Sequence, residues 1–374
     1  IRSMIKKYNK TNTEYYIDAV EYDFSDTSGF NDDILNGKNP DILITSRYCD
    51  MTKWIRNDLT ENLKDYFSND NDISLDQYSQ NIVSSSESGG KINFIFPSYK
   101  INGLIGKSSD VPDGIEWTVN EFISCMESDP KADFYNISSE ELIEKTVMSN
   151  LYGFIDFEKN ECCFDNQSFI TYLDYLKKIS DYTGEKNDYP FRDNKTTLDF
   201  IDMGGFTDFN LMEKGEIGQT SSLKGMPGIY EASVTIDPSY MISIYKKSEF
   251  KSQSWEFIKS FLTDEYQDSL TESQKFFPVK TSSLNILQHQ QTATDSVNYY
   301  HYGDEEIRIY GIDDETTERI INIVKSAKRI KTDDEEINKI IFEETNDFFN
   351  GSKKSSEVSK NLQSRISVYL SEIN

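Results

Sequence analysis

The stretch that decides the fold runs from Val234 to Leu262 and reads VTIDPSYMISIYKKSEFKSQSWEFIKSFL. Residues 240–245 are almost all apolar, which is typical of a strand that is covered on both faces. A polar break follows at residues 246–248. Apolar side chains then return with the spacing of one helix face, at Trp255, Ile258, Phe261 and Leu262. This stretch therefore predicts a buried strand that leads into an amphipathic helix whose tryptophan belongs to the core.

Closer to the start of the chain, two apolar segments flank a short helical turn. Residues 15–22 are rich in strand-forming side chains, residues 32–35 begin a helical turn, and residues 41–44 form a second short apolar run. Strand, helix and strand with short connections predict a parallel βαβ unit. Ligands of such sheets bind beyond the carboxyl ends of the strands, which makes residues 45–50 a candidate site.

The first residues of the chain read as the middle of a helix. Ile1, Met4, Ile5 and Tyr8 recur with helical spacing. We therefore expect residues upstream of Ile1, including a first strand and the segment that targets or anchors the protein.

Composition limits the classes of function. The chain has 374 residues, enough for two domains, and a net charge of −26. Binding to nucleic acid needs a basic surface, so this charge argues against it, and it also argues against docking on anionic lipid. No apolar run reaches the roughly 18–20 residues that span a bilayer. With four cysteines, two histidines and no CxxC pair, a Cys/His zinc site is not expected.

No reactive constellation stands out in the sequence. The nucleophile-elbow, zinc-protease, phosphate-loop and EF-hand patterns are all absent. Carboxylates are plentiful, so a glycoside hydrolase stays open, and it would need two of them facing each other roughly 5–10 Å apart. We expect a binding protein and not an enzyme, with no cofactor and no metal.

Several motifs resemble one family, the bacterial extracellular solute-binding proteins (family 1) that serve carbohydrate ABC importers. The segment from Ile340 to Glu372, IIFEETNDFFNGSKKSSEVSKNLQSRISVYLSE, is the closest match, and the strand-break-helix stretch from Tyr240 is another. PDGIEWTVNEF at residues 112–122 resembles the family's entry into its second lobe, with Trp117 read as a packing residue. The resemblance covers the whole chain, although Asp58 and Lys275 replace glycines that the family often has there.

The resemblance implies an α/β protein with the two-lobed periplasmic-binding-protein-like fold of type II. Its discontinuous lobes are expected at residues 1–104 plus 246–297 and at 105–245 plus 298–374, joined by hinge crossings over a cleft. Asn298 to Gly303 is a further candidate crossing. The implied function is capture of an extracellular carbohydrate, an oligosaccharide, and its delivery to a permease by a monomeric, lipid-anchored protein on the surface of a Gram-positive bacterium. The alternative is a surface interaction or sensor protein on the same fold.

Aromatic rings and carboxylates in the loops near predicted strand ends suit a sugar, because rings stack on its C–H faces and carboxylates accept from its hydroxyls. By the resemblance, Asp50 falls where a hydroxyl-binding carboxylate is common and Phe206 falls near a stacking aromatic. For each of these residues a purely structural role stays open. The candidate ligand-binding residues are Tyr48, Asp50, Tyr99, Tyr152, Phe206, Asp208, Tyr230 and Glu231.

Overall fold

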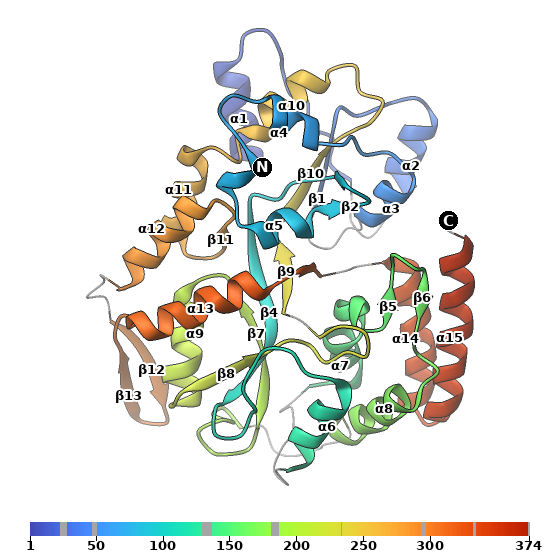
Figure 1. Cartoon of the computed structure of the whole chain (residues 1–374), viewed down its shortest axis with the longest axis vertical. Helices are drawn as coiled ribbons and strands as arrows, with labels where there is room; N and C mark the ends of the chain where they lie inside the picture. The colour runs from blue at the N-terminus through green and yellow to red at the C-terminus, as the bar shows by residue number, and fades with distance from the viewer. Residues whose placement is uncertain are drawn as a thin grey trace. The chain divides into compact units, whose positions relative to one another are not determined.

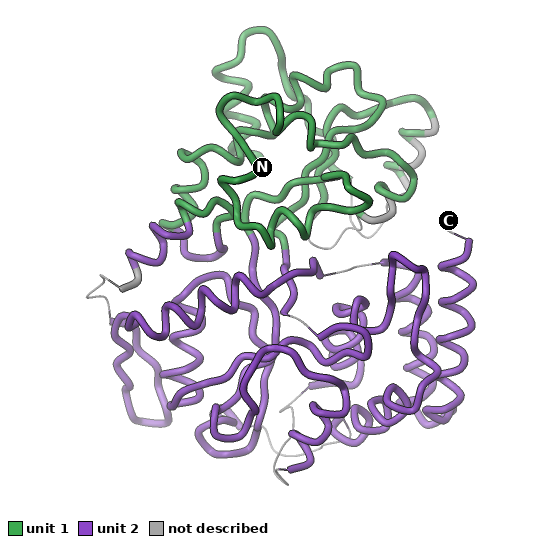
Figure 2. The backbone as a smooth tube through the Cα atoms, in the orientation of Figure 1, with its two compact units in different colours: residues 1–98, 238–272, 278–283 green, residues 99–237, 273–277, 284–374 purple. Residues whose placement is uncertain are grey.

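The chain divides into two compact units, each built from separate pieces of sequence (Figure 2). A computed structural model describes residues 1–22, 28–46, 51–128, 137–180, 187–232, 234–292, 297–331 and 334–372. Unit 1 comprises residues 1–98, 238–272 and 278–283, and unit 2 comprises residues 99–237, 273–277 and 284–374. The lobes expected from the sequence change at residues 104, 245 and 297, whereas the chain passes between the units near 98, 237 and 272–284.

Unit 1 combines short helices with very short strands. Its main elements are α1 (Arg2–Thr11), α2 (Ser28–Leu35), β1 (Ile42–Ser46), α3 (Met51–Arg56), α4 (Lys64–Asn69), α5 (Gln80–Ser85), β2 (Glu87–Ser88), β3 (Lys91–Ile92), β10 (Tyr240–Ile244), α10 (Lys251–Lys259) and α11 (Asp264–Ser273). Two further elements, β11 (Phe277–Pro278) and α12 (Thr281–Thr292), contain residues of both units.

The predicted strand at residues 240–245 is confirmed as β10, which lies beside β1 (Figure 1). The two strands are antiparallel, with Ile42 opposite Ile244 and Ile44 opposite Ile242. The prediction of a strand at residues 15–22 is wrong, because the structure assigns no strand there. Among the described residues no strand lies alongside that segment, so its strand-forming side chains have no ladder to join.

The amphipathic helix that follows β10 is also confirmed. It is α10, and Trp255 is buried on its inner face. The indole ring packs edge-on against Phe67 at 5.0 Å between ring centroids, and its N–H donates to Asp70 at 2.8 Å. A buried indole needs such a partner, which makes Trp255 a core residue of unit 1 as expected.

Unit 2 is larger and contains the longest strand. Its elements are β4 (Ser98–Lys107), α6 (Val119–Ser128), α7 (Ser139–Thr146), β5 (Ile155–Asp156), β6 (Glu161–Cys162), α8 (Gln167–Ser180), β7 (Leu198–Met203), α9 (Phe206–Asn210), β8 (Ser221–Lys224), β9 (Thr235–Pro238), β12 (Asn298–Tyr302), β13 (Glu305–Ile309), α13 (Asp314–Ser326), β14 (Arg329–Ile330), α14 (Glu335–Phe349) and α15 (Ser355–Glu372).

The main sheet has the order β11-β4-β9-β14, and β7 and β8 both pair antiparallel with β4. The short β14 runs parallel to β9. Residues 298–303 were expected to be a crossing, but they begin an antiparallel hairpin, β12–β13, inside unit 2. The hairpin forms because Gly303, at φ +57°, allows the tight turn between the two strands.

A capping box forms the start of α6. The carboxylate of Glu121 accepts from the backbone N–H of Thr118 at 2.6 Å, and the hydroxyl of Thr118 accepts from the N–H of Glu121. Trp117 is buried just before it, and its indole N–H donates to the carbonyl of Gly225. Trp117 is therefore a packing residue, as expected.

Two long helices, α14 and α15, close the chain and contain most of the segment from Ile340 to Glu372. A buried carboxylate links them, because Glu344 on α14 accepts from Lys353, Asn361 and Arg365 at 2.7–2.9 Å. Burial by itself would raise the pKa of Glu344, but these donors together hold the pKa below its ordinary value.

Glu344→Gln is expected to make the stability of unit 2 less dependent on pH. A carboxyl whose pKa is lower in the folded state stabilises the fold above the unfolded pKa, and this contribution disappears as the pH falls through the folded pKa. The melting-temperature difference between the two proteins should therefore be constant from pH 7 to about 5 and shrink below about pH 4.3. The exposed Glu336→Gln on the same helix is the control. An undiminished difference at pH 3 would contradict this account.

Candidate ligand-binding surface

Two glycines bring the segments of a polar and aromatic cluster together in unit 2. The carbonyl of Gly153 accepts from the N–H groups of Ile229 and Tyr230, at 2.7 and 3.0 Å. A Cβ on Gly228 would lie 1.9 Å from the carbonyl oxygen of Glu231 and 2.7 Å from the Cα of Gly153. Only glycine permits this approach, so the backbone fixes where residues 152 and 230–231 lie.

The centre of the cluster is Arg329, at the start of β14. Its guanidinium lies 4.8 Å from the centroid of the Tyr152 ring, and its Nε is 3.0 Å from a carboxylate oxygen of Glu231. The ring of Phe157 meets that of Tyr152 edge-on at 5.1 Å. The side chains of Tyr152, Glu231 and Arg329 are all partly exposed. We call Tyr152, Tyr230, Glu231 and Arg329 the aromatic-acidic cluster.

Tyr230 adds an exposed ring beside the half-buried thiol of Cys163. Its ring is 48% exposed, the most accessible of the cluster's aromatic side chains. Partial burial and the neighbouring Cys163, Glu161, Cys162 and Asp156 raise the pKa of Tyr230. Burial raises the pKa of Cys163 to about 12, so its thiol stays protonated at neutral pH. The cluster can therefore offer ring faces, a phenol hydroxyl, a carboxylate and a guanidinium to a polar ligand, without a reactive thiolate.

Two of the predicted ligand-binding residues are core residues instead. Tyr99 is fully buried in β4, and its ring packs on Phe277 at 5.8 Å. Phe206 is 1% exposed and meets Phe277 edge-on at 5.9 Å. Neither ring therefore presents a face on which a sugar could stack, because both pack against Phe277 in the interior of unit 2.

Asp208 belongs to the start of α9 and serves its backbone. Its carboxylate accepts from the N–H groups of Gly204 and Gly205 at 2.8 and 3.1 Å. Burial raises its pKa, which the two N–H donors partly offset. A helix cap accounts for this residue. Tyr48 and Asp50 lie outside the described residues.

A second polar group lies on the paired strands β4 and β7. Asp202, opposite Asn102 in the register, accepts from Lys100 at 2.8 Å and from Asn102 at 3.1 Å. The ammonium of Lys100 also lies 5.6 Å from the centroid of the Phe276 ring. The charges in these strands are balanced, since the lysine already has a carboxylate partner.

Sequence reasoning missed Arg329, the residue that joins the aromatic-acidic cluster. It stands in a two-residue strand that follows a helix, and no motif surrounds it. Only the pairing of β14 with β9 brings it next to Tyr152, which is 177 positions away by residue number.

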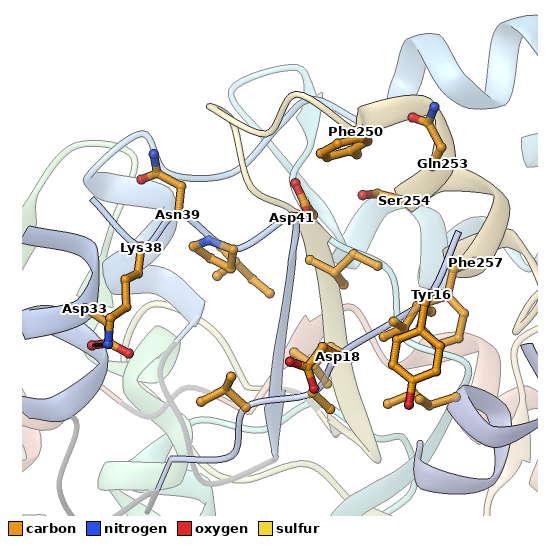
Figure 3. Close-up of a pocket in the computed structure, with 18 of the residues that line it drawn as sticks. Tyr16, Asp18, Asp33, Lys38, Asn39, Asp41, Phe250, Gln253, Ser254 and Phe257 are labelled. Carbon is orange, nitrogen blue, oxygen red and sulfur yellow. Dashed lines mark hydrogen bonds and ion pairs between the residues drawn. The ribbon is translucent and has the colours of Figure 1, made fainter. Parts of the chain in front are cut away.

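Unit 1 contains a groove that encloses about 530 Å³, between α1, residues 15–22, β1 and α10 (Figure 3). Aromatic rings are prominent in its lining, but several are already packed on one another: Tyr8 on Phe257, Tyr15 on Phe250, and Phe30 on Trp54. Asp41, Asn39 and Lys38 lie along one side of the groove in Figure 3.

Within the described ranges, no group of three or more His, Cys, Asp or Glu side chains could hold a metal ion. None of the helices in those ranges is both long enough and apolar enough to cross a bilayer.

The fold is similar to that of solved sugar-binding proteins. The sugar-binding protein MalE from Xanthomonas citri superimposes with a TM-score of 0.63, at 13% identity over 99% of this chain and 94% of that one. The chain has the fold of an ABC solute-binding protein. The ABC substrate-binding protein Lmo0181 from Listeria monocytogenes, solved with cycloalternan, gives a TM-score of 0.61 at 13% identity, covering 99% and 95% of the two chains.

A cyclic alpha-maltosyl-1,6-maltose binding protein from Arthrobacter globiformis has the same solute-binding-protein fold, with a TM-score of 0.60 at 12% identity over 99% of this chain and 95% of that one. No protein-family model matches the sequence, and no curated protein matches it either. The two-lobed, periplasmic-binding-protein-like fold class that the sequence predicts is therefore confirmed by structure and not by sequence identity.

Proposed function

We propose that the protein binds a carbohydrate, an oligosaccharide, outside the cell and delivers it to the permease of an ABC importer. The observation that carries this proposal is the fold, which is shared over 99% of the chain with sugar-binding proteins of such systems. In this proposal the protein is a monomer anchored by lipid at the cell surface, and it performs no chemistry on the sugar. The sequence carries none of the reactive motifs considered above, which makes binding the simpler role.

We assign ligand contact to the aromatic-acidic cluster and to the two candidate residues outside the described ranges, Tyr48 and Asp50. The exposed ring of Tyr230 offers a stacking face, and the carboxylate of Glu231 can accept from sugar hydroxyls. Arg329 already neutralises Glu231 at 3.0 Å, which suits a neutral sugar.

Tyr230→Ala is expected to weaken sugar binding about tenfold, which corresponds to about 1.4 kcal/mol. The variant loses an aromatic ring, and tyrosine is one of the residue types that most often contribute the largest share of the binding free energy. Titration calorimetry measures this, with the sugar taken from a thermal-shift screen of neutral and acidic oligosaccharides. Tyr299→Ala is the matched control, because Tyr299 is also an exposed tyrosine of unit 2, 54% accessible, but lies on the β12–β13 hairpin.

Three outcomes would count against parts of the proposal. Equal affinities of Tyr230→Ala and Tyr299→Ala would remove the cluster from the binding site. Release of shorter sugars from a bound oligosaccharide would indicate a glycoside hydrolase. A sugar at a hundredfold excess over its Kd should raise the free energy of unfolding by about 2.7 kcal/mol. A screen in which no sugar stabilises the protein would favour the interaction or sensor protein.

A further inference from the structure

Arg329 and Glu231 satisfy only part of each other's hydrogen-bonding capacity. The Nε of Arg329 donates to Oε2 of Glu231 at 3.0 Å. A guanidinium has five N–H donors and an ionised carboxylate has two acceptor oxygens. Within the described ranges neither side chain makes a further hydrogen bond or ion pair, and the two are 40% and 28% exposed. The Nη groups of Arg329 and Oε1 of Glu231 therefore remain as neighbouring donors and acceptor for a ligand.

The ring of Tyr152 holds the guanidinium in place. The guanidinium carbon lies over this ring, 4.8 Å from its centroid, and Phe157 supports the ring edge-on at 5.1 Å. The guanidinium thus occupies one face of the Tyr152 ring, and that face is not available to a sugar. Tyr152 is therefore a positioning residue for Arg329, whereas Tyr230 keeps an exposed ring for stacking.

The backbone fixes both ends of the pair. Arg329 lies in β14 opposite Thr235 of β9, and two residues later the N–H of Lys331 donates to the carbonyl of Ile236 at 2.7 Å. Glu231 directly follows the segment that the carbonyl of Gly153 anchors. Both side chains are thus held before a ligand arrives, and a preorganised site loses less free energy to ordering when it binds.

The charges near the pair disfavour an anionic ligand. Arg329 already faces Glu231, and the nearby Lys159 is engaged by Asp156 at 2.7 Å. Burial raises the pKa of Tyr230, and the neighbouring carboxylates, Glu161 among them, raise it further. A ligand carboxylate would bring one more negative charge to this acidic surface, and like charges that face each other are costly.

Two adjacent sugar hydroxyls match the groups that remain. A hydroxyl both donates and accepts, so one can accept from an Nη group of Arg329 while its neighbour donates to Oε1 of Glu231. Neither charged group is then left without a partner when the ligand covers it. An amine would satisfy only the carboxylate, and a carboxylate would satisfy only the guanidinium.

We infer that Arg329 and Glu231 bind two adjacent free hydroxyls of one sugar residue, and that this hydroxyl-pair site selects neutral sugars over uronates. The inference rests on the proposed function and adds to it the chemical class of the ligand. Arg329 is the specificity-determining residue. Its planar fork supplies the donors, and lysine, a point charge on a flexible stem, does not replace that fork.

The first test replaces the fork and keeps the charge. Calorimetry with maltotriose, cellotriose, mannotriose and galactotriose identifies the neutral probe that binds best. Arg329→Lys is expected to weaken the binding of that probe about tenfold. Arg308→Lys is the matched control, because Arg308 is an exposed arginine of unit 2 whose Nε lies 3.8 Å from Glu306, and it should change the affinity less than about twofold. If Arg329 only neutralised Glu231, lysine would serve equally well, and an unchanged affinity of Arg329→Lys would overturn the inference.

The second test removes the charge and keeps an acceptor oxygen. Glu231→Gln is expected to raise the affinity for trigalacturonate, relative to that for galactotriose, about tenfold. An unchanged ratio would overturn the selectivity against uronates.

The third test removes the hydroxyl pair from the probe. Periodate cleaves the carbon–carbon bond between adjacent hydroxyls, and borohydride then reduces the product. The treated probe should bind the parent protein about tenfold more weakly and should no longer distinguish it from Arg329→Lys. A treated probe that still binds the parent protein better than the variant would contradict the hydroxyl-pair site.

Failure of this inference differs from failure of the proposed function. A neutral trisaccharide whose affinity neither Arg329→Lys nor Glu231→Gln changes would overturn the hydroxyl-pair site and leave carbohydrate binding intact. A parent protein that binds none of the four neutral probes would count against the proposed function and overturn the inference with it.

Discussion

Arg319→Met is expected to lower the free energy of unfolding of unit 2 by about 3 kcal/mol, within the range for breaking a buried ion pair. The carboxylate of Glu213 is 1% exposed and accepts from Arg319 at 2.9 Å, and also from the N–H and hydroxyl of Ser221. Without the guanidinium this buried carboxylate would keep only the ammonium of Lys214 and the hydrogen bonds from Ser221 as partners. Lys214, 3.5 Å away, keeps the loss at the lower end of that range.

Chemical denaturation measures the effect, and two variants serve as controls. Lys214→Met removes the more exposed cation and should cost well under 1 kcal/mol, as exposed ion pairs do. Combining Arg319→Met with Glu213→Gln should recover part of the loss, since no unpaired charge is then buried. If the single Arg319 variant were as stable as the parent protein, the ion pair would have no structural importance.

Phe154→Ala is expected to cost about 3–5 kcal/mol, the usual range for truncating a buried phenylalanine. The ring is fully buried at the centre of an aromatic cluster. It stacks on Phe164 at 5.8 Å and meets Phe169 edge-on at 5.4 Å. Removing it leaves a cavity that the neighbouring rings cannot fill without moving.

Phe342→Ala on α14 is the matched control, because that ring is 42% exposed. Its loss should change the stability by less than about 0.5 kcal/mol. Because both variants replace phenylalanine with alanine, the difference between their denaturation midpoints reports the effect of burial and not of the residue type. A loss below 1 kcal/mol for Phe154→Ala would show that the aromatic cluster repacks.

Periodicity predicted the elements whose side chains follow one clear pattern. The apolar run at residues 240–245 became β10, and the helical spacing that begins at Trp255 became α10. These predictions succeed because burial of one face decides the local structure. Residues 15–22 carry strand-forming side chains as well, but a strand exists only where a neighbour completes its ladder, and that depends on the rest of the fold.

The candidate site was harder to predict than the fold. A phenylalanine just after a predicted strand, such as Phe206, looks the same in the sequence whether its ring faces a ligand or the core. In the structure the ring packs against Phe277 and is buried. Tyr230 and Glu231 lie together with Arg329 only because two glycines let the backbones touch and β14 pairs with β9. Such contacts join positions far apart in the chain, so no local pattern could indicate them.

The pairing of β1 with β10 has a consequence for biosynthesis. About 200 residues separate Ile42 from its partner Ile244, and ribosomes add about 5–20 residues per second. About 10–40 s therefore pass between the synthesis of the apolar segment ILIT and the synthesis of the strand that pairs with it. During that time it is a nascent segment with an exposed hydrophobic strand, of the kind that molecular chaperones bind. Unit 1 is thus completed late in translation, although it contains the first residues of the chain.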